Sequence, residues 1–239
     1  MGLTGGPTYA KLLRGSSPQI YIDPRNRLSR ASTSTQINGF SEFNASNLNF
    51  TFEGTVGYEV DTTQKVSGDL RLNSGRIYTT NTGWFGNMTM CWWMRYIGSV
   101  NATSFYTESN RGPSGCFRIN SYLNSNGTFT FLGYDNSTPG NISATSTTNV
   151  CDGNWHYICC RWQNTSTSGL YIFVNGVQEG YGSGVCNDGT YQNLHLGGVV
   201  GCITTATHNC YLGPIHSFNS ALSASDILYN YNLFKYRYR

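Results

Sequence analysis

Short apolar and aromatic runs, separated by turn-forming residues, constrain the fold of this chain more than any other feature of its sequence. Apolar side chains alternate along the chain from His156 to Trp162 and from Leu170 to Val174, the period-two pattern of half-buried strands. Asn126-Gly127 and Asn175-Gly176 lie between such runs, and Asn-Gly supplies the positive φ angles of a two-residue type I′ turn. The pattern therefore predicts antiparallel strands joined by hairpins.

Strand-like segments recur along most of the chain at roughly the 8–12-residue spacing of a β-sandwich or barrel. We expect strands at residues 19–23, 48–53, 56–60, 68–72, 88–96, 105–107, 116–122, 128–134, 156–162, 170–174, 194–196 and 210–218. Residues 30–47 are polar and are expected to be irregular. One helix is expected from Ser223 to about Leu233, because Ser223 is a good N-cap and Asp226 follows it at capping-box spacing.

The composition supports this all-β prediction and excludes other classes. Only 11% of the 239 residues are charged, which excludes a coiled coil, a bundle of helices with Glu/Lys faces and a charge-driven disordered chain. No stretch of 18 apolar residues occurs, and the N-terminus has no signal-peptide pattern, so we expect neither a membrane span nor export. We expect an N-terminal arm at residues 1–30, one domain at 31–234 and a basic tail at 235–239.

The net charge of +3 is unevenly distributed. The first 30 residues carry five basic residues against one acid, and the last five carry three basic residues, whereas the segment between them holds seven basic and eleven acidic residues. Basic ends on a mildly acidic body suggest that the termini meet an acidic partner, although a merely solvated tail explains the charge equally well. The predicted partner-binding residues are Lys11, Arg14, Arg25, Arg27, Arg30, Lys235, Arg237 and Arg239.

Residues 152–180 carry the most specific motif of the chain, a Asp-Gly-Asn-Trp-His strand followed by a Leu-Tyr-Ile-Phe-Val-Asn-Gly hairpin. This segment resembles the laminin-G-like, concanavalin-A-like lectin family. The resemblance implies a jelly-roll sandwich of two antiparallel sheets, and further matches at residues 68–78, 88–95, 194–198 and 212–227 lie in the corresponding order. The structural motif residues are Asp152, Gly153, Trp155, His156, Asn175 and Gly176, with Trp155 expected to fill the core and His156 to pack beside it.

The segment from Gln19 to Ser29 is similar to the openings of tailed-phage virion proteins of the same family. By analogy, the resemblance implies a phage structural protein.

The chain offers few candidates for catalysis or metal binding. Glu59 and Asp61 share a strand face, but Gln64 stands where a glycosidase of this class would have a third carboxylate. A zinc site at Cys202, His208 and Cys210 with His195 lacks paired Cys-x-x-Cys spacing. We therefore expect no enzyme, no catalytic residue, no metal site and no cofactor, with calcium at Asn187-Asp188-Gly189 or Asp135-Asn136 as the one alternative. The eight cysteines are expected to be reduced and mostly buried.

Two functions fit these features best. The first is a capsid decoration or cement protein on the virion surface, assembled in the bacterial cytoplasm. Such a protein would use its arm and basic ends to bind a major capsid or other virion protein and further copies of itself, as a dimer or trimer. The alternative is a carbohydrate-binding adhesin of a tail fibre or cell surface that binds glycans with its loops. A hydrolase would need paired carboxylates in a cleft. No nucleic-acid or membrane partner is expected.

Overall fold

The structure is a computed structural model that describes residues 13–15, 18, 20–25, 36–39, 48–61, 66–84, 87–100, 104–109, 119–134, 141–163, 169–184, 191–197 and 208–238. The strands in these ranges are β1 (Ile20–Ile22), β2 (Gln36–Gly39), β3 (Leu48–Asp61), β4 (Val66–Trp84), β5 (Met88–Tyr96), β6 (Ser104–Ser109), β7 (Ile119–Leu123), β8 (Phe129–Tyr134), β9 (Asn141–Thr145), β10 (Trp155–Gln163), β11 (Gly169–Val174), β12 (Val177–Ser183), β13 (Tyr191–Leu196) and β14 (Asn209–Phe218). Helix α1 (Ala224–Phe234) and a 3₁₀ turn (Lys235–Arg237) follow them.

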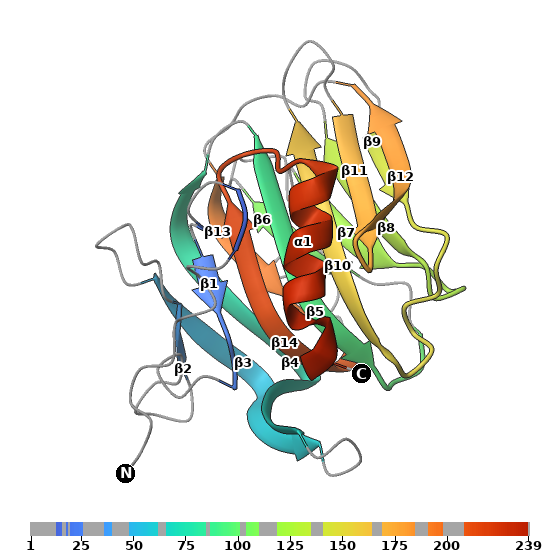
Figure 1. Cartoon of the computed structure of the whole chain (residues 1–239). Helices are drawn as coiled ribbons and strands as arrows, with labels where there is room; N and C mark the ends of the chain where they lie inside the picture. The colour runs from blue at the N-terminus through green and yellow to red at the C-terminus, as the bar shows by residue number, and fades with distance from the viewer. Residues whose placement is uncertain are drawn as a thin grey trace.

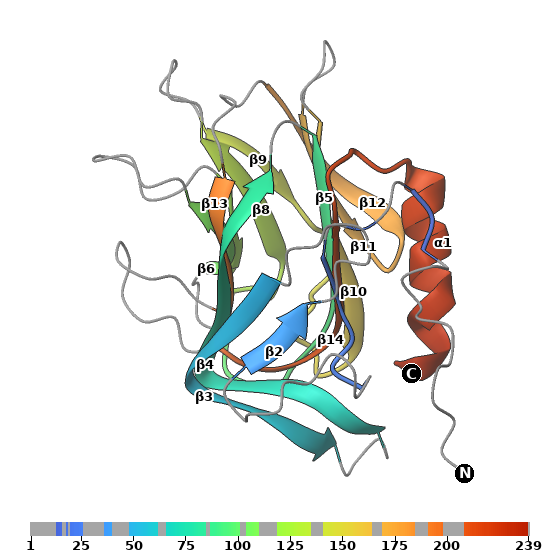
Figure 2. The ribbon, with the colours of Figure 1, turned by 90° about the vertical axis from the view of Figure 1, so that its left-hand side faces the viewer.

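All the described strand pairs are antiparallel, and the strands form two layers (Figures 1 and 2). One layer has the order β12-β11-β10-β5-β14, and the other has the order β13-β6-β7-β8-β9. Strand β4 joins the layers, because residues 70–73 pair with β14 and residues 77–84 pair with β13. Strand β1 pairs with the part of β14 that β4 leaves open, residues 215–217. The expected all-β sandwich of jelly-roll type is confirmed.

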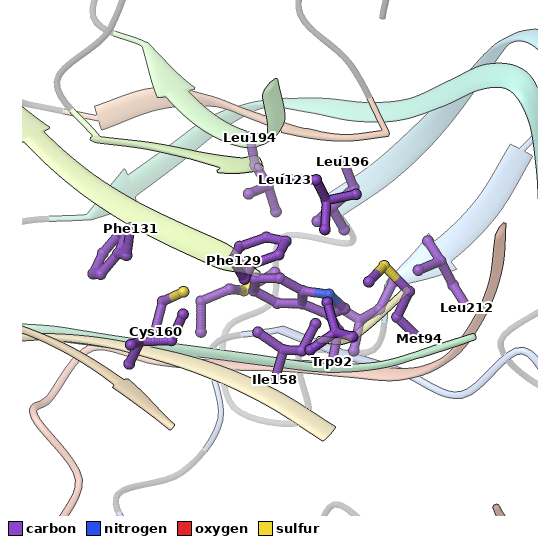
Figure 3. Close-up of a cluster of buried hydrophobic side chains, with 14 of the residues drawn as sticks. Trp92, Met94, Leu123, Phe129, Phe131, Ile158, Cys160, Leu194, Leu196 and Leu212 are labelled. Atoms are coloured by element: carbon purple, nitrogen blue, oxygen red, sulfur yellow. The ribbon is translucent and has the colours of Figure 1, made fainter. Parts of the chain in front are cut away.

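The core lies between the two layers (Figure 3). Trp92 of β5 is fully buried there, and its ring lies 5.6 Å from that of Phe129 on β8. Ile158 and Cys160 of β10 belong to the same cluster, whereas Cys159, between them, belongs to a second one. This alternation explains why β5 and β10 are apolar at consecutive positions: each of them is covered on both faces.

Helix α1 covers the outer face of the layer that contains β5, β10 and β14 (Figure 2). Its buried residues are Ile227, Asn230 and Phe234. The expected N-cap is confirmed, since the Asp226 N–H donates to Ser223 Oγ at 3.1 Å. The helix therefore creates a second apolar cluster outside the sandwich. Among the described residues, no helix is long and apolar enough to span a membrane.

Several local expectations need correction. Residues 36–39, expected to be irregular, form β2, because pairing with β3 needs only backbone hydrogen bonds and no apolar pattern. The two strands expected between residues 48 and 60 are one strand, β3, with a register shift between Glu53 and Thr55. The edge strand β9 (Asn141–Thr145) was not anticipated, because its sequence is polar. By contrast, the strand expected at Met88–Tyr96 is confirmed at both ends.

Only one of the two expected type I′ turns forms. Asn175 and Gly176 have φ angles of 53° and 82°, as such a turn requires. At Asn126-Gly127 only Gly127 has a positive φ, of 79°. The loop there is longer, and it is closed by the Asn124 N–H, which donates to the Thr128 carbonyl at 2.8 Å. The Asn126 side chain accepts the Thr128 N–H, a local hydrogen bond that favours this longer loop over the two-residue turn.

Candidate functional site

The site begins with the turn that precedes β10. Asp152 Oδ1 accepts the backbone N–H of Asn154 at 2.9 Å, and Gly153 has a φ of 81°. The Gly153 carbonyl accepts a hydrogen bond from Arg95 Nε at 2.7 Å, which ties the turn to β5. These contacts explain the Asp-Gly-Asn sequence: the carboxylate closes the turn and glycine permits the left-handed backbone. The turn presents an exposed Asn154 side chain immediately before the first residue of β10.

The turn between β11 and β12 lies next to it and is joined to it by His156. Asn175 Oδ1 accepts the Tyr157 N–H at 3.0 Å, and Asn175 Nδ2 lies 3.2 Å from His156 Nδ1. His156 Nε2 lies 2.9 Å from Asp152 Oδ1. Because the amide nitrogen can only donate, Nδ1 accepts and Nε2 carries the proton that is donated to Asp152. His156 therefore joins the two turns through both of its ring nitrogens.

Hydrogen bonds also set the charge of Asp152. Burial alone raises the pKa of its carboxyl group, but the hydrogen bonds from Asn154 and His156 outweigh burial and lower the pKa below its usual value. The carboxylate is thus ionised and committed to holding the two turns.

Four aromatic rings pack behind these turns, against the carboxyl end of α1. Trp93 stacks on Tyr238 at 4.9 Å and on Tyr231 at 5.6 Å between ring centroids. Trp155 meets the Tyr238 ring edge-on at 4.7 Å. Trp155 is buried in the apolar cluster under α1, outside the core between the layers. The reason is that the odd-numbered residues Trp155, Tyr157 and Cys159 of β10 face the helix.

A pocket of about 230 Å³ opens between the two turns and the end of α1. It is lined by Trp93, Asn154, Trp155, Asn175, Tyr231, Lys235 and Tyr238. Its aromatic members come from the paired strands β5 and β10, from α1 and from the segment after it. Lys235 is the one charged side chain among these seven residues. We call this cavity the aromatic pocket.

Three aromatic residues of the pocket each have an enclosed polar atom without a hydrogen-bond partner in the described part of the chain. Trp93 Nε1, Trp155 Nε1 and Tyr238 Oη are buried and make no hydrogen bond to any described residue. Burial raises the pKa of Tyr238 well above its usual value, so its hydroxyl stays protonated. Unpartnered buried donors are uncommon in folded proteins. The core between the layers holds such a donor too, the Nε1 group of Trp162.

Two of the predicted partner-binding residues are engaged within the chain. Arg25 binds the fully buried Asp69 through Nε at 2.8 Å and Nη2 at 2.9 Å. Arg237 binds the buried Asp23 at 2.9 and 3.2 Å. Arg25 Nη1 also donates to the Arg237 carbonyl at 2.9 Å, and its guanidinium lies 3.9 Å from the centroid of the Tyr238 ring. These five residues form a terminal clamp that joins the segment after β1, strand β4 and the segment after α1.

The other predicted partner-binding residues are separate from the clamp. The Arg14 guanidinium lies 4.0 Å from the centroid of the Tyr229 ring on α1. Lys235 lines the aromatic pocket. Lys11, Arg27, Arg30 and Arg239 lie outside the described residues.

The candidates for metal binding and hydrolysis are not brought together among the described residues. No group of three His, Cys, Asp or Glu side chains that could hold a metal occurs in that part of the chain. Cys202, Asp135, Asn136, Asn187, Asp188, Gly189 and Gln64 lie outside it, and of Glu59 and Asp61 only the backbone, in β3, is described. Five cysteines are described as free thiols, and Cys91, Cys159, Cys160 and Cys210 of these are buried.

The residues of the aromatic pocket were only partly predictable. Trp155 and Asn175 belong to the motif quoted above, and Lys235 stood out by charge. Tyr231 and Tyr238 gave no signal of their own, because a tyrosine near the end of a chain with 17 of them is unremarkable in sequence. Only the docking of α1 brings them beside Trp93.

The two-layered sandwich with a covering helix defines the class of the protein as a lectin-like jelly roll, and solved structures support this. The fourth domain of AbnA, a GH43 extracellular arabinanase from Geobacillus stearothermophilus, solved in complex with arabinotriose, matches with a TM-score of 0.65 at 13% identity, over 89% of this chain and 97% of that one. The receptor-binding domain of botulinum neurotoxin type G matches with a TM-score of 0.64 at 13% identity, over 90% of this chain and 51% of that one.

A family model described as the Concanavalin A-like lectin/glucanases superfamily matches residues 66–228. The chain belongs to this superfamily, as the resemblance of its sequence motif implied. A search of curated protein sequences finds no significant match.

The toxin relatives are longer than this chain. The binding domain of botulinum neurotoxin DC, solved in complex with SialylT, has a TM-score of 0.64 at 14% identity, and the match covers 85% of this chain and 49% of that one. The chain thus spans about half the length of these toxin domains. These relatives lend no support to the tailed-phage part of the resemblance, which stays a prediction.

The turn at Asn175-Gly176 offers a test of how α1 is held. A Cβ atom on Gly176 would lie 2.8 Å from Leu228 Cδ1 and 3.2 Å from Leu228 Cα, whereas a Cβ on Gly153 would meet nothing within 4 Å. Both glycines have positive φ. Gly153→Ala is therefore expected to cost roughly 1–2 kcal/mol of unfolding free energy for the left-handed backbone, and Gly176→Ala roughly 2–4 kcal/mol because it also displaces the helix. Urea denaturation of both variants measures the difference, and equal losses would contradict the helix contact.

Proposed function

We propose that this chain is a non-catalytic carbohydrate-binding domain and that the aromatic pocket is its binding site. The observation that carries the proposal is the pocket's composition: indole and phenol rings form its walls, and an exposed amide and an ammonium group lie among its lining residues. The proposal takes up the second of the two functions inferred from the sequence, with the site at the end of α1.

The chemistry of sugars suits such a site. A sugar ring has a face of C–H bonds that packs against aromatic surface, and hydroxyl groups that need directed hydrogen bonds. Asn154 Nδ2 donates to Asp152 Oδ2 at 2.9 Å, which leaves Asn154 Oδ1 as a fixed acceptor for a sugar hydroxyl. The amide is thus oriented before a ligand arrives, which lowers the entropic cost of binding.

The relatives support binding in preference to hydrolysis. The arabinanase domain, which the match covers over 97% of its length, was solved with arabinotriose, and the neurotoxin binding domain, covered over 49%, was solved with SialylT. Hydrolysis of a glycosidic bond needs two carboxyl groups, roughly 5–9.5 Å apart. None of the seven residues that line the pocket is acidic. A capsid decoration role, with a place on the virion surface and partner binding by the basic ends, remains the alternative proposal from the sequence.

Binding of the full chain to an array of plant, bacterial and animal glycans tests the proposal. We expect at least one sugar to bind and Asn154→Ala to weaken that binding roughly 2–10-fold, the effect of losing one hydrogen bond. Isothermal titration with the selected sugar measures the change. Asn219→Ala, which alters an exposed asparagine that does not line the pocket, serves as the control. Failure of every glycan to bind, or equal affinity of the Asn154 variant, would contradict the proposal.

A further inference from the structure

The aromatic pocket has an unbalanced charge. Lys235 is the one charged residue that lines it, and its Nζ has two tyrosine rings as neighbours, at 5.3 Å from the centroid of Tyr236 and 6.0 Å from that of Tyr231. No carboxylate of the described residues forms an ion pair with this ammonium group. An unpaired cation beside a cavity favours an anionic ligand.

Three carboxylates that act on pocket residues, Asp152 beside Asn154 and Asp69 and Asp23 near Tyr238, have other partners within the chain. Asp152 accepts hydrogen bonds from Asn154 and His156. Asp69 is bound by both nitrogens of Arg25, and Asp23 is bound by Arg237. Asp69 and Asp23 are thus neutralised by guanidinium groups, whereas Asp152 stays ionised and is held by uncharged donors in its turn. None of the three forms an ion pair with Lys235.

The uncharged polar atoms of the pocket's aromatic residues do not oppose this preference. The three unpartnered groups of Trp93, Trp155 and Tyr238 can all donate a hydrogen bond, and the two indole groups cannot accept one. Their hydrogens carry partial positive charge that no described acceptor offsets. None of these three groups brings a negative charge to the surroundings of Lys235.

The size of the pocket limits the ligand. A volume of about 230 Å³ corresponds to seven or eight water molecules at roughly 30 Å³ each, which is room for one sugar ring with its substituents. A longer oligosaccharide would have to leave the pocket after its first residue.

We propose that the aromatic pocket selects a single acidic sugar residue, a uronic or sialic acid, whose carboxylate binds Lys235. This inference rests on the proposed carbohydrate-binding function and adds the class of sugar. The sugar ring lies against Tyr231, the half-buried ring among the pocket's aromatic residues, and a ring hydroxyl donates to Asn154 Oδ1. The neutral counterpart of the same sugar keeps these contacts and loses the charge-assisted hydrogen bond between its carboxylate and Lys235.

The test compares acidic and neutral sugars in matched pairs: galacturonic acid with galactose, glucuronic acid with glucose, and a sialylated glycan with its desialylated form. Titration calorimetry with the full chain is expected to show at least tenfold tighter binding of one acidic member. Lys235→Gln is expected to remove most of that difference and to leave the affinity for the neutral member within about twofold. Arg14→Gln, which removes the same charge from a side chain outside the pocket, is the control.

The outcomes separate the two proposals. Equal or tighter binding of the neutral sugars overturns the selection of acidic sugars and leaves the carbohydrate-binding function intact. The absence of binding to any sugar overturns both. A merely structural role of Lys235, which lies at the carbonyl end of α1, predicts a lower melting temperature of Lys235→Gln with unchanged preference for acidic sugars, and that result also overturns the inference.

Discussion

Arg25→Ala is expected to lower the free energy of unfolding by about 3–5 kcal/mol, because it leaves the buried carboxylate of Asp69 without its partner. Asp69 has no solvent exposure, so water cannot replace the guanidinium. The loss corresponds to a fall in melting temperature of roughly 6–20 °C for a domain of this size. Thermal unfolding followed by circular dichroism measures it.

Two further variants make this prediction specific. Arg14→Ala removes an exposed guanidinium that lies over the Tyr229 ring, and is expected to cost less than about 1 kcal/mol. The double variant Arg25→Leu/Asp69→Leu removes both charges and is expected to recover much of the stability, since a buried pair contributes little beyond an apolar pair of similar size. If Arg25→Ala and Arg14→Ala melted at the same temperature, the terminal clamp would not stabilise the fold.

The stability of Arg25→Ala is also expected to depend on pH. Burial raises the pKa of Asp69, while the hydrogen bond and the charge of Arg25 oppose that rise. Without Arg25 the pKa rises further, so the folded state binds the proton more tightly than the unfolded state does. The deficit relative to wild type is therefore full above the folded-state pKa and shrinks as the pH falls through it. Melting curves from pH 8 to pH 4.5 measure this trend, and a deficit that grew on acidification would contradict it.

Tyr238→Ala is the second substitution with a large expected effect. The ring is 4% exposed, stacks on Trp93, meets Trp155 edge-on and lies under the guanidinium of Arg25. Removing it creates a cavity between the aromatic pocket and the terminal clamp. We expect a loss of about 3–5 kcal/mol in unfolding free energy, measured by urea denaturation.

Neighbouring and conservative variants provide the controls. Tyr236, two residues earlier, is 71% exposed, and Tyr236→Ala is expected to change stability by less than about 0.5 kcal/mol. Tyr238→Phe keeps the ring and removes an unpartnered hydroxyl, so its stability is expected to equal or exceed wild type by up to about 1 kcal/mol. A marked loss in Tyr238→Phe would mean that the hydroxyl has a partner in solution.

The sequence predicted the local elements well where a short-range rule governs them. Alternating apolar residues identified β10 and β11, and Asn175-Gly176 identified the turn after β11, because side-chain period and backbone φ are properties of adjacent residues. Ser223 identified the start of α1 in the same way. The apolar pattern did not predict β2, because the pairing of β2 with β3 depends on backbone groups that every residue carries.

The sequence alone also determined the class of fold and the uneven distribution of charge. What the basic ends bind within the chain was decided by the tertiary structure, because Arg25 and Asp69 are 44 positions apart and Arg237 and Asp23 are 214 positions apart. The aromatic pocket has the same origin: Trp93, Trp155 and Tyr238 come from β5, β10 and the segment after α1. Charge and aromatic content can be counted along a chain, but the partner of a buried charge and the walls of a pocket depend on which distant segments pack together.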